Sequence, residues 1–556
     1  MKKTGKAIVA TGHPLVSGAA VEILRNGGNA FDAAVGAGFA GAVAEQTLTS
    51  LGGGGFLLAR TQQGEEILFD FFTDTPGRGL DSSDLEPHFF PVTIHFPGSD
   101  QDFNIGLGSV AVPGNLKGFL HVHQRLGRLD LAEILQPAIR LARDGLELND
   151  WQGYFLNLLE PIVTHSPVGR KLYTINGSCA KQGDHITNPE IADFLSQLPK
   201  DYGESFYRGA LAKAIDYDMR KGKGLLTAED LAAYKVIERA PLAIGYRDYT
   251  FLTNPQPSMG GSLIGLALSL LETQDMSGIK YHSAVHALQT AKLMTEVEEL
   301  RENGLNTMSL QKSGARIRQF SRGTTHISVA DAEGNVASMT CSNGEGSGYF
   351  VPGTGIMLNN MMGEDDLHPA GFHASPPGQR VSSMMSPSLL LKNEAVAMVI
   401  GSGGSKRIRT AITQVLSAII DFAIPVQQAV EAPRIHWDGA MMQVEPGYAF
   451  SLDIIHLYQQ IKGQNEFVLS KQLLRSGTSI GANIEEASAA QSRKDFIAKM
   501  SVASKEARET LYWLRLLRDS NICTEKELAG TIEESKQIIR MLTAIVKTTK
   551  IKLNSS

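Results

Sequence analysis

The chain has 556 residues, 42% of them apolar and 20% charged, which excludes a disordered or fibrous protein and allows two or more domains with sizeable cores. No apolar run approaches the roughly 18 residues of a membrane helix, and residues 1–14 are too short and too broken for a signal-peptide core. Cys179, Cys341 and Cys523 show neither disulfide-framework nor zinc spacing. We therefore expect a cytoplasmic protein without a metal, a cofactor or a membrane partner.

The amino-acid composition and the net charge of the chain change near residue 450. All 22 prolines and 52 of the 56 glycines precede residue 451. The net charge of −6 divides into −10 before this point and +4 after it. A glycine-rich α/β part followed by a helical part is the simplest interpretation.

The first part begins with a buried helix of small residues over 31–40, followed by four glycines at 52–55 and a strand over 67–71. The glycines are not followed by the Gly-Lys-Ser/Thr ending of a phosphate loop, so tight backbone packing near a pocket is favoured. Further helices are expected over 130–145, 190–198 and 262–272, the last after a proline-glycine turn at 254–261. A polar stretch over 296–322 is expected to be an accessible loop.

A β-hairpin is expected immediately after this loop. Two β-prone runs, 324–330 and 336–342, flank Asp331, Gly334 and Asn335, which are typical turn residues. In this register Ser342 faces Thr324 across the strands. A cut before Thr324 would give its hydroxyl group a neighbouring α-amino group with a pKa of about 7.7 to 8.0, which is a suitable base. In isolation, however, such a threonine-rich hairpin is usually ordinary β-sheet.

A glycine turn follows a later strand. The strand over 396–400 leads into Gly401-Ser402-Gly403-Gly404-Ser405 and then into a helix over about 406–422. Backbone N–H groups at such a turn can bind an anion, and in an acyl-transfer enzyme they would form the oxyanion hole.

Several ordered motifs in residues 1 to about 447 resemble the γ-glutamyltranspeptidase (glutathione hydrolase) family of N-terminal nucleophile hydrolases. These motifs are Gly27-Gly28-Asn29-Ala30-x-Asp32-Ala33-Ala34, the loop from Gly52 to Phe56, Val112-Pro113-Gly114, Thr324-Thr325-His326, Leu358-Asn359-Asn360, Ser382-Ser383-Met384 and Gly401 to Ser405. The resemblance implies a self-cutting proenzyme with a four-layer αββα sandwich, an α/β (α+β) fold. Residues 1–323 would form the large subunit and 324–447 the small one.

The resemblance also implies roles for individual residues. Thr324 would be the nucleophile and Ser342 its supporting hydroxyl group. Gly403 and Gly404 would form the oxyanion hole. Ser382 and Ser383 would hold the α-carboxylate of the acyl donor, and Glu364 its α-amino group, with Asn343 as a further substrate ligand.

Two departures from the family pattern weaken the expected glutamyl specificity. The family's Asp-Phe-Arg motif, whose arginine binds the donor carboxylate, reads Asp70-Phe71-Phe72 here. A phenyl ring cannot form a bidentate bond with a carboxylate. Arg78 is an alternative cation, although an exposed loop arginine is the simpler interpretation. Met361 stands where the family has a polar residue before the acid.

Residues 448–556 resemble a different family, the four-helix-bundle proteins encoded in intervening sequences of bacterial 23S ribosomal RNA genes. The resemblance rests on the run from Leu473 to Ala487. About four helices are expected, with breaks near Gly463, Ser476-Gly477 and Ser520-Asn521. This family implies a bundle that self-associates. A surplus of four positive charges gives no basic stripe for RNA, so no nucleic-acid partner is expected.

Three functions remain open from the sequence. The first is a self-processing enzyme that transfers a γ-glutamyl group, as in glutathione, through Thr324 to water or an amino acid. The second is an amidohydrolase of the same class that acts on a different acyl amide. The third is an uncut, inactive fusion whose bundle is an oligomerisation module, because the small subunit ends about 50 residues before the usual family length.

Overall fold

The computed structural model describes residues 6–80, 86–96, 99–303, 323–368, 371–437, 442–445, 450–464, 466–488, 490 and 493–554. They form two compact units, which are described separately. The first unit comprises residues 1–95, 101–272 and 306–412, and the second comprises 96–100, 273–305 and 413–556. The expected boundary at residue 447 and most of the expected loop, residues 304–322, lie outside the described residues.

A six-stranded antiparallel sheet forms the centre of the first unit. Its strands, in spatial order, are β1 (Ile8–Thr11), β13 (Thr324–Ala330), β14 (Val336–Ser342), β2 (Gly54–Arg60), β3 (Glu66–Phe71) and β10 (Ile237–Arg239). β13 and β14 form the predicted hairpin, and Thr324 pairs with Ser342, which confirms the predicted register. The hairpin that begins at Thr324 therefore lies between β1 and β2, two strands that precede it in the sequence.

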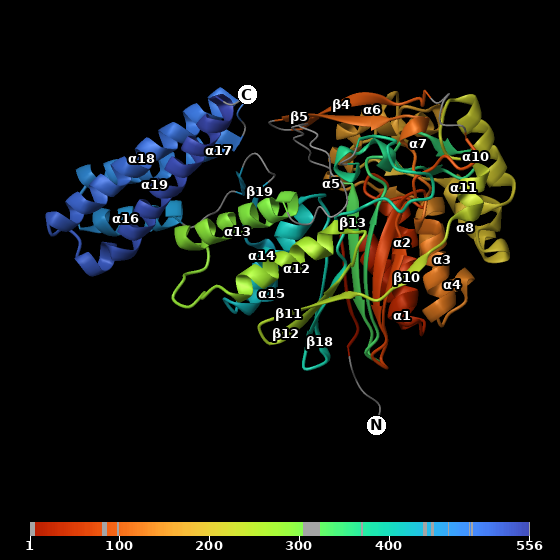
Figure 1. The fold of residues 1–556 in the computed structure, drawn as a ribbon, viewed down its shortest axis with the longest axis horizontal. Helices are drawn as coiled ribbons and strands as arrows, with labels where there is room; N and C mark the ends of the chain where they lie inside the picture. The colour runs from red at the N-terminus through yellow and green to blue at the C-terminus, as the bar shows by residue number, and fades with distance from the viewer. Residues whose placement is uncertain are drawn as a thin grey trace. The chain divides into compact units, whose positions relative to one another are not determined.

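A second sheet and two helical layers complete an αββα sandwich (Figure 1). The second sheet contains β11 (Leu242–Tyr246), β12 (Tyr249–Thr253), β17 (Ser388–Lys392) and β18 (Ala395–Ile400). Ser338 joins the sheets, because its hydroxyl group donates to the Ile400 carbonyl and accepts from the Ser388 N–H. The outer layers contain α2 (Ala30–Ala44) and α3 (Asn115–Leu126) on the first sheet and α12 (Met259–Glu272) on the second. The predicted fold class is confirmed.

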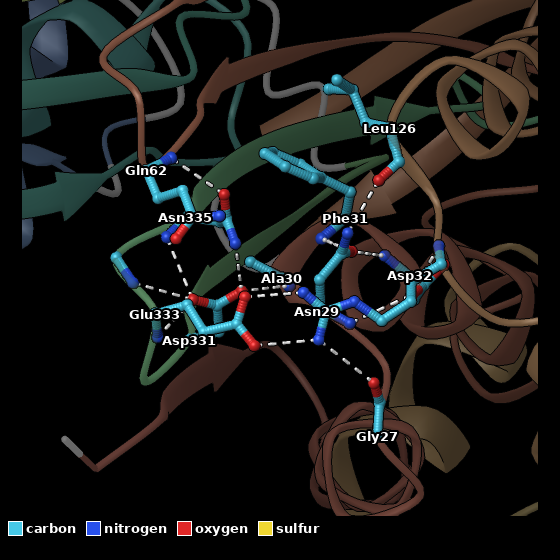
Figure 2. A network of polar contacts seen from close by, with 12 residues as sticks. Gly27, Asn29, Ala30, Phe31, Asp32, Gln62, Leu126, Asp331, Glu333 and Asn335 are labelled. Carbon is cyan, nitrogen blue, oxygen red and sulfur yellow. Dashed lines mark hydrogen bonds and ion pairs between the residues drawn. The ribbon is translucent and has the colours of Figure 1, made fainter. Parts of the chain in front are cut away.

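Helix α2 is entirely buried because its residues are small and apolar. A capping box fixes its start, since the Asn29 side chain accepts from the Asp32 N–H and the Asp32 carboxylate accepts from the Asn29 N–H. Figure 2 shows this start beside the β13–β14 turn, where the Asp331 carboxylate accepts from the Ala30 N–H at 3.0 Å. The N-terminus of α2 thus holds the turn of the hairpin.

Most of the other predicted elements of the first part are present. β3, β18, α4 (Leu131–Asp144) and α8 (Pro189–Asp201) match their predicted ranges closely, and α14 (Arg407–Ile420) follows the glycine turn. The stretch from 296 was wrongly expected to be a loop, because α13 (Ala284–Asn303) continues to residue 303. Leu293 and Val297 of this helix are buried, so packing extends it through the polar sequence.

The C-terminal part of the second unit is helical, as expected. It contains α16 (Phe450–Gly463), α17 (Val468–Ser488), α18 (Arg493–Asp519) and α19 (Glu525–Asn554), drawn in blue in Figure 1. The predicted break at Ser476-Gly477 was wrong. Gly477 lies inside α17 against Ile454, where a Cβ would come within 2.6 Å of the isoleucine side chain. Glycine therefore permits close helix packing here instead of ending the helix.

None of the helices in the described part of the chain is long and apolar enough to span a bilayer.

Candidate active site

Thr324 is the first residue of β13 and lies at one end of a row of residues across the large sheet. Thr324 pairs with Ser342, Ser342 pairs with Gly54, and the next residue in the row is Phe72. Successive strands lie about 4.8 Å apart, so this row places the Phe72 backbone roughly 14 Å from that of Thr324. Side chains alternate along strands, and all four positions therefore face the second sheet.

The bond before Thr324 is held by groups that suit its cleavage. The Ser342 hydroxyl group donates to the Gly323 carbonyl oxygen and accepts from the Gly344 N–H at 3.0 Å. A side chain at residue 323 would overlap the Gly344 carbonyl, so this position requires glycine. A donor on the carbonyl group stabilises the negative charge that forms when a nucleophile attacks it. The predicted hairpin register placed Ser342 beside Thr324, and the two residues are paired in the structure.

The turn at 401–405 lies against Thr324. A Cβ on Gly403 would come within 2.5 Å of the Thr324 carbonyl oxygen, and Gly404 has a φ of +112°, which favours glycine. Gly403 therefore allows the loop backbone to approach the threonine closely, and Gly404 allows the turn its left-handed conformation. This is the arrangement that an oxyanion hole made of backbone N–H groups requires.

His326 shares the face of Thr324 but has other partners. Its ring nitrogens lie 2.8 Å from the Thr340 hydroxyl oxygen and 2.9 Å from that of Ser328. Burial lowers its pKa to about 4, so the ring is neutral at physiological pH. Both nitrogens are already engaged, and His326 therefore does not serve as the base for Thr324 in this arrangement.

Glu364 and Asn343 lie near the cleavage point. A Cβ on Gly344 would overlap the Glu364 carboxylate, so this acid lies directly beside the residue that contacts Gly323. Asn343 is 1% exposed, and neither polar atom of its amide has a hydrogen-bond partner among the described residues. A buried amide without partners is costly unless a ligand or water satisfies it.

Ser382 and Ser383 lie on the loop before β17, and their described contacts are with the turn before α12. The Ser382 hydroxyl group donates to the Pro257 carbonyl at 3.1 Å. Ser383 accepts at its carbonyl from Ser258 and Met259, and its side chain accepts from the Met385 N–H. These bonds fix the serine pair, while none of them joins it to Thr324.

The two residues that depart from the family pattern, Phe72 and Met361, lie close together. Phe72 is 1% exposed and stacks on Phe56 with ring centroids 5.5 Å apart. The next residue, Thr73, contacts the Met361 sulfur at 3.4 Å through its hydroxyl oxygen. This part of the site is therefore apolar where the family has a cation and a polar residue.

In this structure, neither nearby arginine replaces the arginine with which the family binds the donor carboxylate. The Arg78 guanidinium is paired with Asp230, with Nε 3.9 Å from a carboxylate oxygen. Arg380, which the sequence analysis did not consider, is buried and donates to the Phe72 carbonyl, the Lys235 carbonyl and the Tyr234 hydroxyl group. Its Nε lies 3.2 Å from Asp74 and 3.6 Å from Asp70. Arg380 therefore ties the segment after β3 to the loop of Ser382.

Glu45, the residue after α2, was not among the predicted site residues. The Thr325 hydroxyl group donates to its carboxylate at 3.0 Å. Burial raises the pKa of Glu45 to about 7. The available signal was that Glu45 is the only charged residue between Asp32 and Arg60. Among the residues that the structure describes, no group of three or more His, Cys, Asp or Glu side chains could hold a metal ion.

Comparisons with known proteins show which family and which relatives this chain is similar to. The model of the family "Gamma-glutamyltranspeptidase" matches residues 16–303 and 289–495. The glutathione hydrolase proenzyme of Escherichia coli is 31% identical over 510 residues, which cover 83% of this chain and 85% of that protein. The acylase ACY 1 proenzyme of Pseudomonas sp. strain SE83 is 31% identical over 469 residues, covering 79% and 84%.

Solved structures give two further likenesses. The cephalosporin acylase of Bacillus halodurans has a TM-score of 0.67 and 27% identity, and the match covers 80% of this chain and 86% of that one. A protein of the S23 ribosomal protein family from Bacteroides thetaiotaomicron is 49% identical over 18% of this chain and 92% of its own, with a TM-score of 0.17.

Proposed function

Because this chain belongs to the γ-glutamyltranspeptidase family, whose members are self-processing N-terminal nucleophile hydrolases, we propose that it cuts itself between Gly323 and Thr324 and then uses Thr324 as its nucleophile. The Thr324 hydroxyl oxygen would attack the Gly323 carbonyl carbon and replace the peptide bond with an ester. Water would then hydrolyse the ester and leave Thr324 with a free α-amino group.

The freed amine would serve as the base in turnover. It would take the proton of the Thr324 hydroxyl group as the oxygen attacks the amide carbonyl of the donor. The Gly403 and Gly404 N–H groups would stabilise the oxyanion, and the amine of the donor would leave with a proton. Water or the amino group of an acceptor would then attack the acyl ester and regenerate Thr324.

The hydrogen bond from Ser342 to the Gly323 carbonyl carries this proposal. It places a donor on the carbonyl group that would be attacked, while Gly403 packs on Thr324 from the side of the second sheet. Glu364 and the unpartnered Asn343 amide are proposed substrate ligands beside this point, together with Ser382 and Ser383. A γ-glutamyl amide such as glutathione is the leading acyl donor.

The apolar pair Phe72 and Met361 favours a second candidate, an amidohydrolase for a donor without an α-carboxylate. The acylase relatives support this alternative. The test compares hydrolysis of a γ-glutamyl anilide with that of its decarboxylated analogue. Weak discrimination, less than about ten-fold in kcat/KM, is expected because Arg78 and Arg380 are both engaged with other groups of the chain. A strong preference for the anilide that carries the carboxylate would mean that another residue replaces the family's carboxylate-binding arginine.

Self-cleavage can be tested directly on a denaturing gel. The 60.0 kDa chain would divide in the ratio of 323 to 233 residues, giving bands of roughly 35 and 25 kDa on a denaturing gel. Thr324→Ala is expected to leave one band and no turnover. The exposed strand threonine Thr93, which is bonded to Asp102, provides the control Thr93→Ala. A single band from the wild-type chain would favour the uncut, inactive alternative.

We also propose that residues 448–556 are a fused bundle of the ribosomal intervening-sequence type and that they mediate self-association. The four helices and their two apolar clusters support this proposal. Light scattering of the full chain tests it, and a monomer at micromolar concentration would contradict it. A cytoplasmic location is proposed because the three cysteines are unpaired, and cell fractionation would test that location.

A further inference from the structure

Glu45 joins the large-subunit part of the chain to the residue after the nucleophile. Its carboxylate accepts from the Thr325 hydroxyl group at 3.0 Å, across 280 residues of sequence. Gly12 makes room for it, because a Cβ at that position would come within 2.6 Å of the second carboxylate oxygen and 3.2 Å of the Thr325 hydroxyl oxygen. Three segments of the chain thus meet around one buried carboxyl group.

The surroundings of Glu45 lack a compensating charge. It is 5% exposed, and among the described residues no Lys, Arg or His pairs with it. It also follows the C-terminal end of α2, where the helix dipole disfavours a negative charge. The groups near its carboxylate are Thr325 on β13, Cys341 on β14, Gly12 just after β1, and Gly41 on α2. Cys341 is the titratable group among them, and burial keeps its thiol protonated.

Glu45 cannot take part in the chemistry directly. Thr325 and Thr324 are consecutive in β13, so their side chains point to opposite faces of the sheet. Thr325 and Glu45 face the helical layer, whereas Thr324 faces the glycine turn and the second sheet. Any effect of Glu45 on Thr324 must therefore pass through the backbone of β13.

We propose that Glu45 is a positioning residue for the nucleophile, which holds Thr325 and thereby fixes the Gly323–Thr324 bond for self-cleavage and Thr324 for turnover. This inference rests on the proposed function. The paired strands on both sides fix the middle of β13, but its first residue has no β1 partner, because β1 ends opposite Ile327. The Glu45–Thr325 bond is therefore the side-chain contact on the helical side that secures the start of the strand.

A consequence is that the protonation of Glu45 affects self-cleavage near neutral pH. With a pKa of about 7, the carboxyl group is protonated below neutrality and ionised above it. The ionised form is the stronger acceptor for the Thr325 hydroxyl group, because hydrogen bonds to a charged acceptor are stronger than those to a neutral one. The uncut chain has no α-amino group at Thr324, so a change in cleavage rate near pH 7 cannot come from that amine.

The experiment follows self-cleavage of freshly translated full-length chain by loss of the 60.0 kDa band between pH 5.5 and 8.5. Glu45→Ala and Thr325→Val are each expected to slow cleavage about 10- to 100-fold, since small misplacements of reacting groups have effects of this size. Thr325→Ser keeps the hydrogen bond and should retain most of the rate, whereas Glu45→Gln, a neutral acceptor like the protonated acid, should cut at the low-pH rate of the wild type. Glu45→Gln should also lack the wild-type inflection near pH 7.

Turnover of a γ-glutamyl anilide separates positioning from folding. In the mature enzyme, Glu45→Ala and Thr325→Val should lower kcat and leave KM nearly unchanged, and the double variant should be no slower than either single variant. Wild-type cleavage rates in both Glu45→Ala and Thr325→Val would overturn the inference, as would an unchanged inflection in Glu45→Gln. A wild-type chain that neither cuts nor turns over would instead overturn the proposed function.

Discussion

At the scale of single residues, Ser342 has the most direct contact with the bond to be cut. Its hydroxyl group is the donor on the Gly323 carbonyl. Ser342→Ala removes this donor and should slow self-cleavage about 100-fold, which is the usual effect of losing one oxyanion donor. Ser342→Thr keeps the hydroxyl group and is the matched control. Time courses on a denaturing gel measure both rates, and an alanine variant that cuts as fast as the threonine variant would refute the assignment.

The raised pKa of Glu45 also predicts how the stability of the protein depends on pH. A carboxyl group with a higher pKa in the folded state contributes stability below its unfolded pKa, and this contribution is lost as the pH rises through the folded pKa. For Glu45 this contribution to stability is lost between about pH 4.5 and pH 7. Each pKa unit corresponds to about 1.4 kcal/mol. Ionisation of Glu45 therefore lowers the free energy of unfolding by roughly 3 kcal/mol over this range.

The comparison of Glu45→Gln with the wild type isolates this contribution. The glutamine variant cannot ionise, so its free energy of unfolding should fall less between pH 5 and pH 8 than that of the wild type. Urea titrations of the uncut Thr324→Ala background at the two pH values measure the difference. Equal losses in both proteins would show that Glu45 ionises without a penalty.

At the scale of elements, the β13–β14 turn is the far end of the hairpin that carries Thr324. Asp331 accepts from the N–H groups of Glu333, Gly334 and Asn335 with one oxygen. Its other oxygen accepts from the Ala30 N–H at the start of α2 (Figure 2). One carboxylate thus closes the turn and attaches it to the helical layer.

Loss of this carboxylate should weaken the hairpin. Asp331→Ala leaves several backbone donors without their acceptor, and we expect a decrease of about 2–3 kcal/mol in the free energy of unfolding. The control is Glu333→Gln, which breaks the exposed ion pair with Arg128 and should cost less than about 1 kcal/mol. Urea denaturation of the Thr324→Ala background gives both values, and similar effects for the two variants would contradict the special role of Asp331.

The elements also show what the sequence can predict. The hairpin and the Thr324–Ser342 register follow from local turn residues and from strand alternation, so they could be predicted. The break at Ser476-Gly477 could not, because the glycine is needed for contact with Ile454 on another helix. The contacts of Glu45 with Thr325 and of Arg380 with Phe72 span 280 and 308 residues. Such pairs depend on the packing of distant segments, and no local pattern reveals them.

At the scale of the whole molecule, the order of strands decides what happens after cleavage. β13 and β14 follow the cut, yet they pair with β1 and β2, which precede it. Separating the two pieces would therefore break two strand pairings in the middle of the sheet and expose the apolar residues between the sheets and α2. The free energy of that exposure is much larger than the gain in chain entropy from one cut bond.

We therefore expect the two pieces to stay together in the mature protein. Native mass spectrometry of a sample that shows two bands on a denaturing gel should give subunits present in equal numbers, with no free small piece. Addition of urea should release both pieces in one transition, because β13 and β14 cannot leave without opening the sheet that β1 and β2 complete. Release of the small piece while the large piece keeps its secondary structure would show that the central sheet does not depend on β13 and β14.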